Sequence, residues 1–217
     1  MDLERSLTFP FKDDEWLQKL LIAGIVGVIP IVNLALTGWG IRQLKKVIED
    51  QELPLPDWSD FGDYFVKGLL VVIGNLIYAI PMLILICLAS IFDQGMWSGT
   101  SYTYSDGPGI VGICFGCLTA LWGLLVGIVL PAAVTQYAVS EDFASFFRFG
   151  EIFGYIGRNL GNYIIALIVA VLVWIAASIV GGVFCGVGVI LTVPWATLVT
   201  AHLLGLVYKG RSTLDTI

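Results

Sequence analysis

The chain has 217 residues, of which 58% are hydrophobic and only 13% are charged. Soluble domains carry close to a quarter of charged residues, so this composition indicates an integral membrane protein. The net charge of −6 argues against binding nucleic acid through a basic surface. Residues 1–16 are polar and acidic, and no short apolar stretch with a cleavage site precedes the first apolar run, so no secretory signal is expected.

Long apolar runs predict the membrane segments, because crossing a hydrocarbon core of about 30 Å takes about 20 apolar residues. Four runs fit ordinary spans: residues 65–92, 109–136, 163–180 and 183–208. Basic residues lie outside loop 93–108 and flank the other ends of the runs. The positive-inside rule therefore predicts a multi-pass protein of the cell membrane, with loop 93–108 external and segments 37–64, 137–162 and the C-terminus cytoplasmic.

The first apolar run, residues 17–41, has two flanks that are both predicted to be cytoplasmic. A re-entrant or kinked hairpin bent at Ile29 and Pro30 satisfies this, because proline removes a helix hydrogen bond and clashes with the preceding turn. A fifth span is the alternative, since about 25 residues are enough to cross. The sequence thus predicts one transmembrane domain over residues 1–217, an all-α bundle of four spans plus an N-terminal hairpin.

Two cytoplasmic segments carry apolar side chains at helical spacing, with charges on the remaining surface. One begins at Trp39 and the other at Ser140. Both are predicted to be amphipathic helices that lie in the membrane interface, where such helices anchor adjoining spans or shape the bilayer.

Five short motifs follow one another along the chain. They are Phe9-Pro10-Phe11 with Asp13-Asp14 and Trp16, Ile29-Pro30-Ile31-Val32-Asn33, Leu53-Pro54-Leu55-Pro56-Asp57-Trp58, Phe147-Arg148-Phe149-Gly150-Glu151-Ile152, and Ala201-His202-Leu203-Leu204-Gly205. Together and in this order they resemble the prokaryotic family known as domain of unknown function 4013. The resemblance spans nearly the whole chain, and it implies a multi-spanning membrane protein of an uncharacterised family, without an assigned activity.

Polar side chains inside the apolar runs are candidate ligand contacts. Asn75 lies about 15 Å along its helix from Phe65, near the midplane, and Tyr78 follows almost one turn later. Asn33 can reach the same depth from the hairpin. These residues form a candidate site for a small neutral or lipidic molecule, although interhelical hydrogen bonds use the same residue types.

His202, the single histidine, lies in the last run and is a candidate for the same polar site. The expected role is a neutral imidazole that hydrogen-bonds another helix. Because the runs contain no second histidine and no carboxylate, no metal site, cofactor or proton relay is predicted.

Cys114 and Cys117 are spaced to share one helix face, and the predicted topology puts them in the outer leaflet with Cys87 and Cys185. This pair is the candidate redox site of a membrane thiol oxidoreductase. Two observations count against it: loop 93–108 contains no cysteine, and no cation lies nearby to lower a thiol pKa. Reduced cysteine also often serves as a small buried hydrophobic residue.

Glycine occurs 25 times, often at four-residue spacing. The pairs are Gly112 and Gly116, Gly123 and Gly127, Gly150 and Gly154, Gly157 and Gly161, and Gly182 and Gly186. Close helix packing within the subunit is expected there, with association with another membrane protein as the alternative.

No catalytic constellation is present, so the sequence predicts a protein that is not an enzyme. The favoured role is an accessory or scaffold subunit that contacts membrane lipids and a membrane-protein partner or a second copy, or that shapes the bilayer. A facilitator or binder of a small neutral or lipidic molecule is the second hypothesis, and the thiol oxidoreductase is the third.

Overall fold

A computed structural model describes residues 3–93, 110–183 and 188–214, which are helical with short connections and contain no strand. The α-helices are α1 (Leu3–Thr8), α2 (Trp16–Val28), α3 (Leu34–Ile48), α4 (Phe61–Asp93), α5 (Ile110–Ser140), α6 (Phe149–Arg158), α7 (Leu160–Val183) and α8 (Val189–Leu214). Short 3-10 helices are η1 (Phe9–Lys12), η2 (Trp58–Asp60) and η3 (Phe143–Phe147).

Four of these helices, α4, α5, α7 and α8, are long and apolar enough to cross a membrane. They correspond to the four runs predicted as ordinary spans. The predicted all-helical fold with four such helices is therefore confirmed. Pro81, Pro131 and Pro194 lie inside α4, α5 and α8, and each helix continues through its proline.

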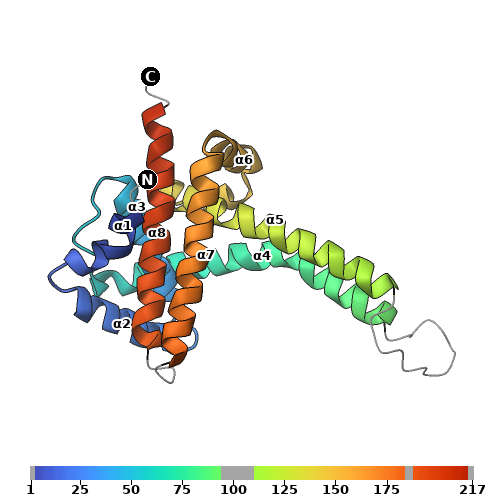
Figure 1. The fold of residues 1–217 in the computed structure, drawn as a ribbon, viewed down its shortest axis with the longest axis horizontal. Helices are drawn as coiled ribbons and strands as arrows, with labels where there is room; N and C mark the ends of the chain where they lie inside the picture. Colours follow the sequence, from blue (N-terminus) through green and yellow to red (C-terminus); the bar gives the residue numbers. More distant parts are fainter. Residues whose placement is uncertain (1–2, 94–109, 184–187, 215–217) are drawn as a thin grey trace. The chain divides into compact units, whose positions relative to one another are not determined.

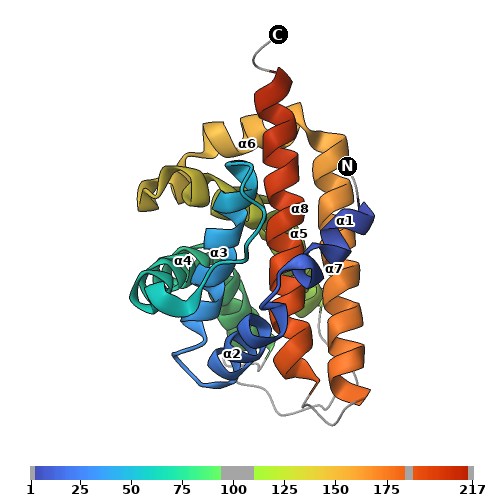
Figure 2. The same ribbon diagram turned by 90° about the vertical axis from the view of Figure 1, so that its left-hand side faces the viewer.

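Contacts within the chain group it into two compact units. Unit 1 comprises Met1–Val72 and Pro131–Ile217, and unit 2 comprises Ile73–Leu130. In unit 1, α8 is the central helix: it packs against α7 and against α2 and α3 (Figures 1 and 2). In unit 2, the indole nitrogen of Trp122 on α5 donates a hydrogen bond of 3.1 Å to the carbonyl oxygen of Tyr78 on α4.

The first apolar run forms two helices joined by a turn. Helix α2 ends at Val28, α3 begins at Leu34, and Ile31 between them has a φ of 71°. The chain thus bends beside Pro30, where the hairpin is predicted. With 13 and 15 residues, α2 and α3 are about 20 Å and about 22 Å long, too short to cross a core of about 30 Å. Re-entry into a membrane stays a prediction.

The segment that begins at Trp39 is the second half of α3. Its apolar side chains Trp39, Ile41 and Leu44 are buried in unit 1, where α3 packs against α8. The apolar face of α3 that would have to contact lipid in the interface is therefore covered by the protein itself.

Close helix contacts occur at glycines outside the predicted pairs. A Cβ atom on Gly38 would lie 1.8 Å from the carbonyl oxygen of Tyr64, and one on Gly68 would lie 1.8 Å from that of Leu34. Helices α3 and α4 therefore meet backbone to backbone at these two glycines.

Eight of the ten glycines in the predicted pairs have open space instead. No atom of another element lies within 4 Å of a Cβ at Gly116, Gly123, Gly127, Gly150, Gly154, Gly157, Gly161 and Gly182. Close packing inside the subunit is thus wrong for these positions, because helix crossing points and not residue spacing decide where glycine is needed. Gly186 lies outside the described residues.

Candidate functional site

Three of the sequence motifs meet beside α8. The ring of Phe9 stacks on the imidazole of His202, with centroids 4.4 Å apart. Four residues after Phe9, the carboxylate of Asp13 accepts a hydrogen bond of 2.6 Å from the amide of Leu55. The N-terminal segment, the connector of residues 53–58 and α8 are therefore held together by side chains far apart in the sequence.

His202 is fully buried under α1. Its Nδ1 lies 2.9 Å from the hydroxyl oxygen of Ser6, and its Nε2 lies 3.6 Å from a carboxylate oxygen of Glu52, beyond hydrogen-bond length. Arg5 donates hydrogen bonds of 3.1 Å and 2.7 Å to the other oxygen of Glu52. A serine, a histidine and a carboxylate in this order have the composition of a hydrolytic triad, but Ser6 has no exposed surface, so no substrate reaches its oxygen. Ser6 and His202 connect α1 to α8.

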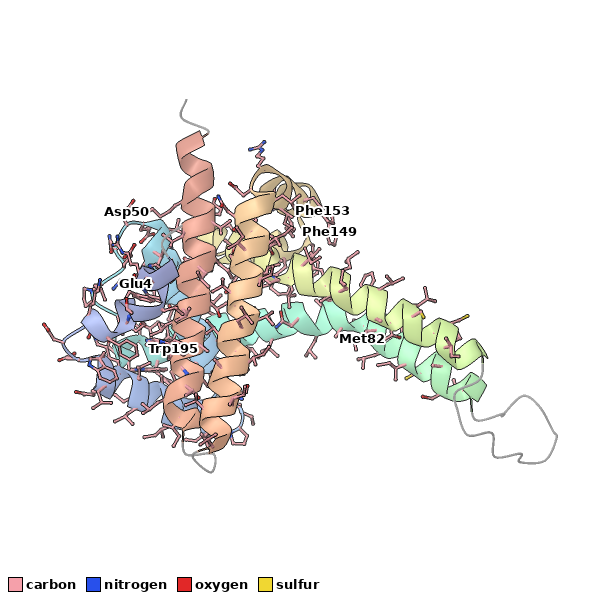
Figure 3. All side chains as sticks on the ribbon, in the orientation of Figure 1. Glu4, Asp50, Met82, Phe149, Phe153 and Trp195 are labelled. Atoms are coloured by element: carbon pink, nitrogen blue, oxygen red, sulfur yellow. The ribbon has the colours of Figure 1, made fainter. Side chains whose placement is uncertain are left out.

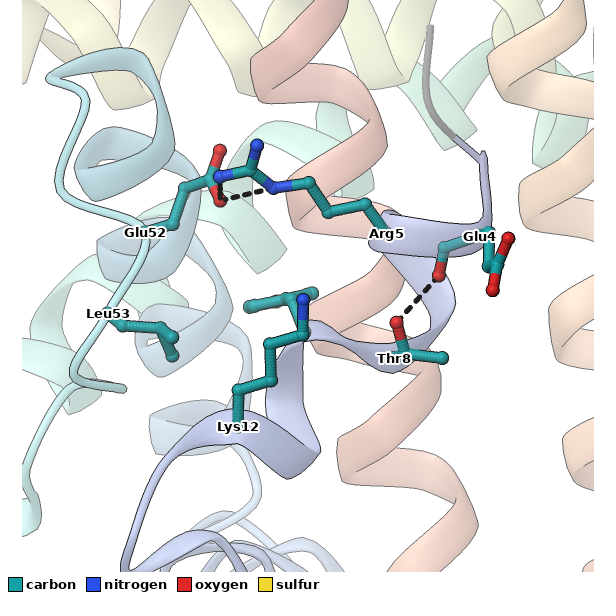
Figure 4. A pocket seen from close by; sticks show the side chains of 7 residues that line it. Glu4, Arg5, Thr8, Lys12, Glu52 and Leu53 are labelled. Carbon is teal, nitrogen blue, oxygen red and sulfur yellow. Dashed lines mark hydrogen bonds and ion pairs between the residues drawn. The ribbon is translucent and has the colours of Figure 1, made fainter.

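A polar cavity of about 330 Å³ lies over this cluster (Figure 4). Its lining comprises Glu4, Arg5, Thr8, Phe9, Lys12, Glu52 and Leu53. The two acidic and two basic side chains balance each other, and Arg5 is bound to Glu52. The cavity therefore has no excess charge with which to select an ion.

Asp13 and Lys19 form a buried ion pair at the start of α2. The Nζ of Lys19 lies 3.1 Å from an Asp13 oxygen and also donates to the carbonyl oxygen of Leu55 at 3.2 Å. Burial alone would raise the pKa of Asp13, but the amides of Leu55 and Glu15 and the Lys19 ammonium outweigh it and hold the pKa below its usual value. This pair fixes the connector to the N-terminal segment.

Two tryptophans, Trp39 of α3 and Trp58 of the connector itself, attach the connector further. The indole of Trp39 donates to the carbonyl oxygen of Pro56 at 2.9 Å, and that of Trp58 donates to the carbonyl oxygen of Lys19 at 3.1 Å. The two indole rings stack with centroids 5.5 Å apart. The connector is thus an integral part of the unit 1 core.

A second cavity, about 390 Å³ in volume, lies within unit 1 and is called the groove below. Its lining comprises Gly27, Asn33, Leu36, Thr37, Gly40, Ile41, Leu44, Val71, Val134, Trp174, Val193, Thr197, Thr200, Ala201 and Leu204. Every one of these residues is uncharged. The hydroxyl of Thr200 accepts a hydrogen bond of 3.2 Å from the indole of Trp174 and donates one of 2.8 Å to the carbonyl oxygen of Ala196.

The four predicted polar site residues have different surroundings. Asn33 lines the groove, whereas His202 lies under α1 and forms a hydrogen bond with Ser6 of that helix. Asn75 and Tyr78 belong to unit 2, where the side-chain oxygen of Asn75 is buried without a hydrogen-bond partner among the described residues. A ligand role for these residues stays a prediction, and only Asn33 lines the groove.

The predicted redox pair lies on α5. Cys87, Cys114 and Cys117 are exposed and free, and no disulfide joins the residues that the structure describes. Cys185 falls outside the described residues. The described ranges also contain no group of three histidine, cysteine or acidic residues placed to hold a metal ion. Thiol exchange at Cys114 and Cys117 stays a prediction.

Glu141 joins three helices where α5 ends. Its φ is 55°, and one carboxylate oxygen accepts hydrogen bonds from Lys45 of α3 at 2.9 Å and from Lys67 of α4 at 3.1 Å. These hydrogen bonds lower the pKa of Glu141 to about 2.

We expect replacement of Glu141 by glutamine to lower the melting temperature at neutral pH. Because the pKa of Glu141 falls from 4.5 to about 2 on folding, its stabilising contribution is complete above pH 4.5 and is lost as the pH falls towards 2. The difference in melting temperature between the wild type and Glu141→Gln should shrink over this pH range. Asp14→Asn, which changes an exposed carboxylate, is the control. A difference that is independent of pH would contradict the expectation.

Over the residues that it describes, the structure is all-helical and has four helices long and apolar enough to cross a membrane. The family described as protein of unknown function DUF4013 matches residues 22–186, which contain three of the five motifs, and the chain belongs to this family, as predicted. It is similar to the uncharacterized protein MJ1189 of Methanocaldococcus jannaschii, with 32% identity over 166 residues. The match covers 76% of this chain and 55% of that protein, so the chain spans about half the length of this relative. No solved structure matches the chain.

Proposed function

We propose that the protein is a multi-pass membrane protein, not an enzyme, that binds a small neutral or lipidic molecule in the groove. The observation that supports this best is the lining of the groove, which combines apolar side chains with three threonine hydroxyls and carries no charge. A volume of about 390 Å³ is within the range of small-molecule sites. Since much of the lining comes from α8, which is apolar enough to cross a membrane, the molecule would enter from the lipid phase.

The hydroxyl groups define the chemistry of the ligand further. Thr197 and Thr200 each donate a hydrogen bond to a carbonyl oxygen of their own helix, at 2.9 Å and 2.8 Å. Because each hydroxyl proton is already used in this way, each oxygen can only accept a hydrogen bond from a ligand. A charged group would lose its hydration in the groove without gaining a counter-charge. We therefore expect a neutral molecule with an apolar body and a hydroxyl or amide donor.

Filling the groove should remove this ligand. Thr37 lines the groove from α3 and is half-buried, so Thr37→Phe adds a ring to the cavity. After purification from native membranes in a lipid-preserving medium, mass spectrometry should find one defined small molecule with the wild type. Thr37→Phe should retain no more than about a tenth of it per protein, because the added ring takes up ligand volume.

The control is Ser178→Phe on α7, where the serine is exposed and lies outside the groove lining. It should retain the ligand at the wild-type ratio. Equal retention by both variants, or a wild type that carries no small molecule in fixed ratio, would contradict binding in the groove.

An accessory subunit is the second candidate, and a cavity in unit 2 favours it. This cavity, about 530 Å³ in volume, lies between α4 and α5 and is lined by Met82, Ile86, Ala89, Ser90, Gly112, Gly116, Thr119, Ala120 and Gly123. Figure 3 shows Met82 on α4. Small residues allow a helix of another membrane protein to approach closely. The same purification tests this role, because an accessory subunit should carry a protein partner in fixed ratio.

A further inference from the structure

Helix α6 has three different faces. Ile152, Tyr155 and Ile156 are buried in unit 1, with exposed fractions of 0%, 0% and 7%. By contrast, Phe149 and Phe153 are 48% and 53% exposed, and Figure 3 shows both on α6. At about 100° per residue, the two phenylalanines are about 40° apart around the helix axis and about a quarter turn from the buried face.

The charged side chains of α6 occupy the third face. Glu151 and Arg158 are exposed and lie about 20° apart around the helix axis. Around the helix axis, the midpoint of Glu151 and Arg158 lies about 170° from the midpoint of Phe149 and Phe153. The apolar and charged faces are therefore nearly opposite, with the bundle contact between them. A helix beside a bundle needs this arrangement in order to have lipid below it and water above it.

Ring contacts fix α6 at one end of unit 1. The ring of Tyr155 lies 5.6 Å from that of Tyr163, in the first turn of α7, and 5.8 Å from that of Tyr208, near the end of α8. Figures 1 and 2 show α6 at the end of the α7 and α8 pair where α7 begins. Since α7 and α8 are both apolar enough to cross a membrane, this end is the level at which they would leave it.

We propose that α6 lies flat in the interface of a phospholipid leaflet, with Phe149 and Phe153 inserted among the acyl chains. The chain itself keeps this segment at the surface, because α6 connects α5 to α7 and both are candidate spans. Charge does not drive the insertion: residues 141–159 contain three acidic and two basic side chains. The leaflet therefore does not have to be anionic, and burial of the two rings supplies the affinity. This inference is independent of the groove.

Photocrosslinking in native membranes tests the proposal. A benzophenone side chain, p-benzoylphenylalanine, is placed at Phe153 in one variant and at Glu151 in a matched variant of the same helix. Mass spectrometry then identifies what each position captures. Position 153 should give adducts with lipid acyl chains at least about ten times more often than position 151, because it faces the opposite side of the helix.

Four results would overturn the proposal. Capture of another protein at position 153 would show that a partner covers the face, and capture of a second copy would show self-association. Equal lipid capture at positions 151 and 153, or none at either, would show that α6 does not lie with its phenylalanines in lipid. The melting temperature of each variant confirms that it folds, and both sites are exposed, so neither substitution disturbs the core.

Discussion

Replacing Lys19 with methionine should lower the free energy of unfolding by roughly 3 kcal/mol, because it leaves a buried carboxylate without its counter-charge. The side chain of Asp13 is only 2% exposed and that of Lys19 only 7% exposed. Lys19 also binds the carbonyl oxygen of Leu55, so its loss weakens the attachment of the connector as well. Chemical or thermal denaturation of the purified protein in a mild detergent measures the change.

A second substitution separates charge from packing. Asp13→Asn combined with Lys19→Met removes both buried charges, while the asparagine oxygen can still accept the hydrogen bond from the amide of Leu55. This double variant should regain most of the stability that Lys19→Met loses. Lys12→Met, at an exposed lysine of η1, should change stability by less than about 0.5 kcal/mol. Equal losses in the single and double variants would show that packing, and not the unpaired charge, is responsible.

The four long helices of this protein are predictable from local sequence, because a long apolar run has few other ways to satisfy its backbone in a membrane. The turn at Pro30 is only partly predictable: proline disfavours a continuous helix, but Pro81, Pro131 and Pro194 lie inside helices that continue. The placement of α3 is not predictable from local sequence. Its apolar side chains suit a membrane surface as well as the protein interior, and only the contact with α8 decides between them.

The candidate sites depend even more on contacts between distant residues. Asn33 is recognisable as a polar group in an apolar run, whereas Trp174 and Thr37 line the same groove only because α3 and α7 lie beside α8. The spacing of Thr197, Thr200 and Leu204 is the signal that could have indicated a shared lining, since residues three and four apart share a helix face. The link between Asp13 and Leu55 joins residues 42 positions apart, which no local pattern predicts.

Substitution of Gly38 by alanine should cost at least about 3 kcal/mol of stability, or prevent folding, because the added atom meets backbone. The Cβ atom would lie 1.8 Å from the carbonyl oxygen of Tyr64 and 2.7 Å from its Cα atom. A side chain could rotate away, but a backbone carbonyl of α4 cannot move without shifting the helix. Separation of α3 from α4 would also open the contact between Gly68 and Leu34.

A graded series keeps this expectation testable even if Gly38→Ala does not fold. At Gly40 the nearest atom is the side-chain methyl carbon of Thr197, at 2.7 Å, which can yield by rotation or a small shift. Gly40→Ala should therefore cost less than Gly38→Ala. At Gly116 no atom lies within 4 Å, so Gly116→Ala should be neutral or should stabilise by up to about 1 kcal/mol, since alanine favours the helix. Melting temperatures of the folded variants should follow this order. A Gly116→Ala variant as unstable as Gly38→Ala would contradict this expectation, because it would require a tight contact at Gly116 on α5.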